Sequence, residues 1–510
     1  GKGATLSWVR IPVSPPLFLN IIKIFKGDMV MAKNVLFIMS DEHQQKASGC
    51  YGHPFVKTPT IDKLAASGTR FTNAYTNSPI CVPARASFAT GRYVHDIGYW
   101  DNAHAYEGRV EGWGHALQKA GMHCLSIGKL HYRSEEDPTG FNEQIVPLHI
   151  VDGKGSVGGS VKQPLAPPIT KSKLVTNIGP GDSGYIQYDQ SIMEKTVEWL
   201  KTEATRLTDK PWALFCSFVC PHFPLIAPQD FYDLYPHDML PHPKGNDPDY
   251  PLHPWIDKFQ KLQCHDDFFT EESRKVAMAS YYGLCSYLDS NISKVLLALE
   301  QAGLRDDTLI VYTADHGENL ATRRLWGKSN MYEEAAAIPM ILSGPGIPSG
   351  KVVNTPVTLA DGSATILDAL GLNNISIGET RSLRKIANEG DDLERVAFSE
   401  YHATGADTAA FMIRKGNFKY IHYVDYEPEL FDQINDPEEE ENVVNNPDLS
   451  DILTDLQKEL YARVDPKAVN DAAQKSQAAL VNAAGGREAV LAKGSFQGTP
   501  APGETAEYIQ

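Results

Sequence analysis

The chain alternates short apolar runs with longer segments of helical periodicity. Continuous apolar runs, typical of strands buried on both faces, occupy residues 34–40, 124–127, 212–219, 308–314 and 338–343. Apolar positions with helical spacing predict helices over residues 59–67, 113–120, 190–207 and 271–302. Because strands and helices alternate, we predict an α/β fold with a large, mixed and mostly parallel sheet flanked by helices.

Polar residues of reactive types follow four of the predicted strands. In such sheets ligands bind beyond the carboxyl ends of the strands, which lie along one edge. Residues far apart in the chain are therefore expected to share one cleft. The residues concerned are Asp41, Glu42, Lys129, His131, His222, Asp315 and His316.

After about residue 390 the pattern changes to short strands joined by tight turns. Residues 395–400, 410–414, 418–424 and 429–432 predict an antiparallel meander, and residues 449–464 a helix that caps it. From residue 466 the chain is rich in Ala, Gln and Gly, and we expect either a loose arm or a helix that packs on a neighbouring subunit. This divides the chain into an α/β domain over residues 31–390, an antiparallel α+β subdomain over 391–465 and an arm over 466–510.

Residues 1–30 precede the first predicted strand. Their apolar stretch, 15–25, is interrupted by Asn20 and Lys23 and falls short of the roughly 18 residues of a membrane span. A signal peptide would need a denser basic start and a small-x-small cleavage site. We therefore interpret this segment as a leader or a start-site extension ahead of Met31.

Composition and charge narrow the class of protein. Apolar residues make up 42% of the 510 residues and charged residues 22%, which is typical of a globular protein with a substantial core. The formal net charge is −17 and no basic cluster compensates for it locally, so nucleic acid is not expected as a partner. A membrane is not expected either, because no apolar run reaches the length of a span. The seven scattered cysteines, without a Cys-x-x-Cys pair, fit a reducing compartment, and we expect a cytoplasmic protein.

The segment Cys81-Val-Pro83-Ala-Arg85 carries the most specific chemical pattern. A proline two residues after the cysteine suits the first turn of a helix, which would put Cys81 at the helix N-terminus and Arg85 one turn later on the same face. Backbone N–H groups, the helix dipole and a guanidinium would then surround one sulfur and form an anion site. The alternative is a small buried cysteine with a surface arginine as its neighbour.

The pattern Cys-x-Pro-x-Arg, followed by Thr90-Gly91-Arg92, resembles the signature of the type I sulfatases of the alkaline phosphatase superfamily. The resemblance runs from Asn34 to about Asp436 and includes residues 58–62, 68–75 and 327–328. It implies an alkaline phosphatase-like fold and conversion of Cys81 to Cα-formylglycine, whose hydrate is the nucleophile. A formylglycine-generating or other sulfatase-maturing enzyme is therefore an expected partner.

The resemblance also implies one divalent metal ion. Its ligands would be residue 81 and the strand-end residues Asp41, Glu42, Asp315 and His316. Oxygen ligands favour Ca²⁺, Mg²⁺ or Mn²⁺, and a histidine shifts the preference toward Mn²⁺, so we expect Ca²⁺ or Mn²⁺ before Mg²⁺. Many sulfatases carry Asp-Asp and Asp-Asn at these places, whereas the Asp-His pair here is similar to phosphonate monoester hydrolases and choline sulfatases. The role of Glu42 stays open.

Basic residues complete the catalytic set that the resemblance implies. Arg85 and the metal would hold the nucleophilic oxygen, and Lys129 and Lys328 would neutralise the sulfuryl oxygens. His222 would protonate the departing alcohol. His131 would deprotonate the remaining hydroxyl of the sulfated hydrate, so that sulfate leaves and the aldehyde re-forms.

The function that follows is hydrolysis of aryl or small alkyl sulfates, with side activity on phosphonate monoesters and phosphodiesters. One alternative makes the phosphonate monoesters or phosphodiesters the main substrates. Another is a choline sulfatase, in which residues 399–401 and 99–100 would bind a quaternary ammonium. The non-enzyme alternative is a degenerate member that binds anionic ligands. We expect a homo-oligomer, either a dimer or a tetramer.

Overall fold

The computed structural model describes residues 1, 31–162, 169, 172–207, 209–372, 375, 377–496 and 498–508. Except for its first residue, the leader predicted over residues 1–30 lies outside the described residues.

An eight-stranded sheet forms the centre of the molecule, with the order β11-β2-β10-β9-β1-β7-β4-β5. Its central strands run parallel, whereas β10 is antiparallel to both of its neighbours. The strands are β1 Asn34–Asp41, β2 Thr69–Phe71, β4 His123–Lys129, β5 Glu143–Leu148, β7 Trp212–Pro221, β9 Thr308–Ala314, β10 Met340–Ser343 and β11 Lys351–Val353. The predicted mixed, mostly parallel sheet is confirmed.

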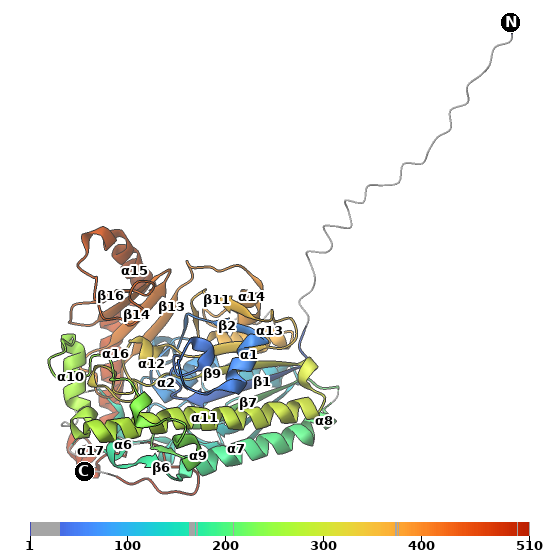
Figure 1. Cartoon of the computed structure of the whole chain (residues 1–510), viewed down its shortest axis with the longest axis horizontal. Coiled ribbons are helices and arrows are strands. Elements are labelled where there is room, and N and C mark those ends of the chain that lie inside the picture. The colour runs from blue at the N-terminus through green and yellow to red at the C-terminus, as the bar shows by residue number, and fades with distance from the viewer. Residues whose placement is uncertain are drawn as a thin grey trace.

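Helices cover both faces of this sheet (Figure 1). Side chains alternate across a strand, so Leu36 and Ile38 of β1 pack in one core cluster and Val35 and Phe37 in another. The first cluster packs against α1 Pro59–Ala66, α7 Gly184–Lys201 and α11 Glu271–Gln301. The second packs against α2 Cys81–Thr90, α4 Trp113–Lys119, α13 Asp361–Ala369 and α14 Leu383–Asn388.

One predicted helix has different ends in the structure. The helix expected over residues 190–207 begins earlier, at Gly184, because the Ser183 hydroxyl accepts a hydrogen bond from the Ile186 N–H and caps it. It stops at Lys201, and a separate short helix, α8 Glu203–Arg206, follows.

The predicted meander forms a second sheet of four antiparallel strands. They are β13 Ala397–Tyr401, β14 Ala410–Lys415, β15 Phe418–Tyr423 and β16 Glu429–Asp432. Helix α15, Ser450–Arg463, covers it through Leu456 and Leu460. The smaller elements are β3 Ala74–Tyr75, β6 Ile178–Pro180, β8 Leu225–Ala227, β12 Val357–Thr358, α3 Val94–Ile97, α5 Val157–Ser160, α6 Lys173–Thr176, α9 Gln229–Tyr232, α10 Pro254–Gln263 and α12 Glu333–Ala336.

The C-terminal segment is not a loose arm. It forms α16, Pro466–Ala483, and α17, Arg487–Lys493, which pack on the same chain. Buried Gln477 donates hydrogen bonds of 2.8 Å to the Asp101 carboxylate and to the His402 carbonyl. The loose-arm expectation is therefore wrong. A contact with a neighbouring subunit and the domain boundaries near residues 30, 390 and 465 stay predictions.

Candidate active site

Two adjacent strand ends bring buried ligand-type side chains together. Asp41 ends β1, and Asp315 follows β9, the parallel neighbour of β1. One ligand-type atom from each of Asp41, Cys81, Asp315 and His316 lies within 4.8 Å of the others. The His316 Nδ1 lies 3.1 Å from the Gly317 carbonyl, so an N–H donated there leaves the Nε2 lone pair directed at the carboxylates, 3.6 Å from each.

This donor set fits one divalent cation. Two carboxylates, an imidazole nitrogen and residue 81 are all fully buried, an arrangement that is costly unless a positive charge lies among them. Burial, followed by the Asp41 carboxylate, raises the pKa of Asp315. This rise in pKa reflects the cost of two like charges placed side by side.

Two cations lie behind the carboxylates. Buried Arg85 donates to Asp315 Oδ2 at 2.8 Å and to Asp41 Oδ2 at 3.3 Å, and its remaining bonds go to the Lys129 carbonyl and the Ser217 hydroxyl. The Lys129 ammonium pairs with Asp41 Oδ2. In this geometry Arg85 and Lys129 orient the carboxylates.

Cys81 is the first residue of α2, as predicted, and Ile80 before it is extended. The Val82 N–H is already taken, because it donates to the Asn102 side-chain oxygen at 3.0 Å. The Cys81 Sγ lies 3.3 Å from His316 Nε2 and 3.7 Å from Asp41 Oδ1. Residue 81 therefore faces the carboxylates and His316.

The surroundings of Cys81 favour a negative charge. Burial opposes ionisation of the thiol, but Lys328, Lys129 and His316 outweigh it and hold the pKa of Cys81 well below its ordinary range. The same cations would stabilise any other anion at this position, including an alkoxide.

Glu42 lies apart from this four-residue group. Its backbone φ of 69° is left-handed, and its Oε2 lies 2.9 Å from Lys328 Nζ and 3.2 Å from His222 Nε2. Burial opposes ionisation, but Lys328 and then His222 hold the pKa of Glu42 below its ordinary value. The charge of Glu42 in turn acts on its neighbour Glu318: burial and then Glu42 raise the pKa of Glu318 well above its usual range. Glu42 also forms a second ligand-type group with Asp41 and His222, so its contact with a metal stays a prediction.

His131 approaches residue 81 from the end of β4. It adopts a left-handed φ of 59°, and its backbone N–H donates to the Leu148 carbonyl at 2.8 Å. Burial, helped by the charge of Lys129, lowers the pKa of His131 to about 3. The imidazole of His131 is therefore neutral, and one of its two ring nitrogens carries no hydrogen.

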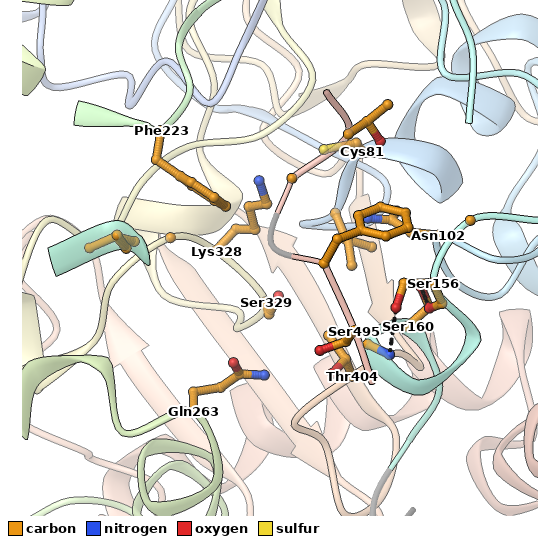
Figure 2. A pocket seen from close by; sticks show the side chains of 18 of the residues that line it. Cys81, Asn102, Ser156, Ser160, Phe223, Gln263, Lys328, Ser329, Thr404 and Ser495 are labelled. Carbon is orange, nitrogen blue, oxygen red and sulfur yellow. Dashed lines mark hydrogen bonds between the residues drawn. The ribbon is translucent and has the colours of Figure 1, made fainter. Parts of the chain in front are cut away.

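A cavity of about 220 Å³ adjoins this group, and five of the site residues line it: Cys81, Lys129, His131, His222 and Lys328. Figure 2 shows Lys328 and Cys81 on one side of it and Ser156, Ser160, Thr404 and Ser495 on the other. Most of the remaining wall is uncharged, with hydroxyl and amide groups beside the aromatic rings of Phe223, Phe259, Trp326 and Phe496.

The prediction that residues 99–100 and 399–401 bind a quaternary ammonium is wrong. Glu400 is fully buried, and its carboxylate is bound by the imidazoles of His95 at 2.8 Å and His402 at 2.7 Å. Tyr99 and Trp100 are buried, and in the described part of the chain neither lines the cavity. The charge of Glu400 is therefore used inside the fold.

Four residues of the site escaped the sequence-based interpretation. They are Asn102, Ser217, Tyr185 and Thr499. Ser217 lies near the carboxyl end of β7, so the strand-end argument that found His222 applies to it as well. Asn102 and Thr499 lie in segments without a periodic pattern.

Comparison with protein families gives the family of the chain. The sulfatase family model matches residues 33–372, and a second model, described as N-sulphoglucosamine sulphohydrolase, C-terminal, matches residues 322–465. The chain is 30% identical over 444 residues to arylsulfatase K of Bos taurus, covering 81% of this chain and 78% of the relative. It is 31% identical over 431 residues to choline-sulfatase of Rhizobium meliloti (strain 1021), covering 81% and 83%.

Solved structures share the fold. Phosphonate monoester hydrolase of Agrobacterium radiobacter superimposes with a TM-score of 0.66 at 21% identity, covering 84% of this chain and 95% of that one. The protein BT4656, in complex with its substrate D-glucosamine-2-N,6-O-disulfate, gives a TM-score of 0.67 at 23% identity and covers 88% and 100%. The family model over residues 33–372, together with the relatives at 30% and 31% identity, shows that the chain belongs to the sulfatase family and is a sulfuric ester hydrolase.

Proposed function

We propose that this chain hydrolyses aryl or small alkyl sulfate monoesters through a formylglycine made from Cys81, with the help of one divalent cation. The observation that carries the proposal is the place of Cys81. It begins α2, lies within 4.8 Å of three further ligand-type groups and is influenced by the charges of Lys129 and Lys328.

Asp41, Asp315, His316 and residue 81 would hold the cation, whereas the Glu42 carboxylate pairs with Lys328. When bound, the ion supplies the positive charge that lowers the pKa of a hydroxyl and draws in a sulfuryl oxygen. The oxygen donors suit Ca²⁺ and Mn²⁺, and the nitrogen donor of His316 shifts the preference toward Mn²⁺; we expect either of these ions before Mg²⁺.

Lys129 and Lys328 are placed to neutralise the sulfuryl group while an oxygen of the hydrated residue 81 attacks its sulfur. Both cations already lower the pKa of the Cys81 thiol. Arg85, which holds Asp315 and Asp41, acts by fixing the carboxylates.

His222 and Lys328 would act on the leaving-group side. Both contact the Glu42 carboxylate, and the His222 Nδ1 lies 2.6 Å from the Phe223 carbonyl. An Nδ1–H donated to that carbonyl directs Nε2 toward Glu42 and the cavity. Nε2 would protonate the departing alcohol.

His131 would complete the cycle. As a neutral base it would take the proton of the second hydroxyl of residue 81, after which sulfate leaves and the aldehyde re-forms. A plain serine or cysteine ester has no second hydroxyl for this elimination, which is the chemical reason for the modification.

The substrate range is tested with the chain co-expressed with a formylglycine-generating enzyme. We expect the highest kcat/KM for 4-nitrophenyl sulfate, lower values for a phosphonate monoester and a phosphodiester, and none of these activities in Cys81→Ala. A preference for the phosphonate monoester would favour the alternative indicated by the Asp315-His316 pair. A preference for choline sulfate would favour the other enzyme alternative.

The state of the cysteines bears on the cellular compartment. All seven cysteines are free thiols in the structure, which supports a reducing compartment and, we propose, the cytoplasm. In the described ranges no helix combines the length and apolarity needed to cross a bilayer. The maturing enzyme would be a partner of the chain, and a homo-oligomer stays a prediction.

A further inference from the structure

The last described residues of the chain form part of the wall of the catalytic cavity. Ser495, Phe496, Gly498 and Thr499 line it together with Cys81, and Figure 2 shows this segment passing from Ser495 toward Cys81. A Cβ atom placed on Gly498 would lie 3.5 Å from the Phe223 ring and 3.9 Å from the His222 ring. The C-terminal segment therefore reaches residues that the proposed reaction uses.

Several contacts fix this segment in place. The buried Tyr185 of α7 donates its hydroxyl hydrogen to the Thr499 carbonyl. The rings of Phe496 and Tyr508 pack with centroids 5.3 Å apart. At the other end Ser495 packs on α5, where a Cβ added to Gly159 would come within 3.1 Å of the Ser495 Cβ.

Thr499 makes the contact with the most direct chemical consequence. Its Oγ1 lies 2.7 Å from His131 Nε2, the ring nitrogen that is not needed as the proton acceptor if Nδ1 is the base. The other ring nitrogen, Nδ1, is buried and makes no hydrogen bond within the described residues. The same ring interacts with the Cys81 side chain.

The tautomer of His131 decides whether it can act as a base. If Nε2 carries the hydrogen and donates it to Thr499 Oγ1, Nδ1 keeps its lone pair and can take a proton. The opposite tautomer would place an N–H at Nδ1 and would leave no basic nitrogen facing residue 81.

We propose that Thr499 is a positioning residue of the active site, which holds His131 in the Nε2-protonated tautomer and directs Nδ1 toward residue 81. In the step it serves, the proton of the second hydroxyl of residue 81 passes to Nδ1. The carbonyl bond forms, the carbon–oxygen bond to sulfate breaks, and its electron pair leaves on sulfate. Water then hydrates the aldehyde again, and the imidazolium returns its proton to solvent. This proposal rests on the role given to His131 in the proposed function.

Two matched variants separate the hydroxyl from the shape of the side chain. Thr499→Val keeps the shape of the side chain and removes the hydroxyl, whereas Thr499→Ser keeps the hydroxyl. If Thr499→Val does not fold, Thr499→Ala takes its place. The first readout needs no turnover. Imidazole ¹⁵N shifts of the Ca²⁺-loaded protein, with His131 assigned by its loss in His131→Gln, should show the Nε2–H tautomer in wild type and Thr499→Ser and its loss in Thr499→Val. An unchanged tautomer in Thr499→Val would overturn the proposal, whether or not sulfate esters are turned over.

The second readout is kinetic. Thr499→Val should lower kcat about tenfold or more and lower KM with it, so that kcat/KM changes little, because the base acts after the alcohol has left and only the breakdown of the sulfated intermediate is slowed. Thr499→Ser should restore most of the loss. In a His131→Ala background Thr499→Val should have no further effect, since the hydroxyl acts only through that ring. An equal loss in both backgrounds would contradict the assignment.

Discussion

Glu42 and Lys328, 286 positions apart in the chain, form an ion pair of 2.9 Å at the wall of the catalytic cavity, which Lys328 lines. The proposed sulfate-binding lysine is therefore balanced by a carboxylate before any substrate arrives. The same carboxylate faces His222 and lies outside the group formed by Asp41, Cys81, Asp315 and His316. From this geometry we expect the Glu42 carboxylate to weaken the binding of anions at Lys328.

The first prediction concerns metal content. Asp315→Asn removes a charged member of the four-residue group, so the purified variant should lose its divalent ion and its activity. Glu42→Gln should keep one ion per chain, because its carboxylate serves Lys328. Elemental analysis after gel filtration measures both, and loss of the ion from Glu42→Gln to the same degree would make Glu42 a ligand.

The second prediction uses product inhibition by inorganic sulfate. Glu42→Gln leaves Lys328 without its counter-charge and should tighten inhibition by about fivefold, or about 1 kcal/mol. Lys328→Gln should weaken inhibition, since it removes the cation. Inhibition constants for the two variants are measured against the same aryl sulfate, and a change in the same direction for both would refute the role of this pair.

The third prediction separates the two histidines. His222→Ala should slow esters of poor leaving groups far more than esters of activated phenols, because an activated phenol needs little proton assistance. His131→Ala should instead release about one alcohol per site in a burst and accumulate sulfate on residue 81. A leaving-group series and rapid-mixing kinetics test both roles. An equal loss across the series for His222→Ala, or a linear time course for His131→Ala without trapped sulfate, would reject the respective role.

The fourth prediction concerns stability and pH. Burial lowers the pKa of His95, but the Glu400 carboxylate outweighs it and raises the pKa from 6.5 to about 9. Because the folded-state pKa is the higher one, the stability from this pair is complete below pH 6.5 and is lost as the pH rises through about 9. His95→Gln should therefore lower the free energy of unfolding by about 2 kcal/mol at pH 6 and by much less at pH 10.

Urea unfolding at the two pH values measures this difference. The matched control is His242→Gln, because His242 is exposed and its nearest carboxylate oxygen is 3.5 Å away. The same loss for His95→Gln at both pH values would show that packing, and not the charge on His95, links β13 to the α/β domain.

Much of the fold could be predicted because buried strands and helices require apolar residues at regular positions along the sequence. The run from Asn34 to Asp41 is buried throughout, as a central parallel strand requires, and the strand over Thr308–Ala314 has the bounds expected from its apolar run. The strand-end argument brought Asp41 and Asp315 to one place, because parallel strands end at the same edge.

Other parts of the site had no such signal. The side-chain direction of Glu42 depends on a left-handed backbone angle, and the expected ammonium site around Glu400 failed because two histidines bind its carboxylate. Thr499 follows α16 and α17, which pack on the rest of the chain through contacts such as the hydrogen bond from Gln477 to Asp101. Long-range packing of this kind leaves no periodic pattern at the residue that finally contacts His131.

The central claim, that residue 81 acts as an aldehyde, is tested most directly by mass analysis of the tryptic peptide 71–85 from active protein. The dehydrated aldehyde form should be about 18 Da lighter than the thiol form. Because hydration restores nearly that mass, the digest is also treated with a hydrazide that labels aldehydes. We predict labelling of this peptide in proportion to specific activity, with none in Cys81→Ser. Fully active protein whose peptide carries only an unmodified Cys81 thiol would contradict the account.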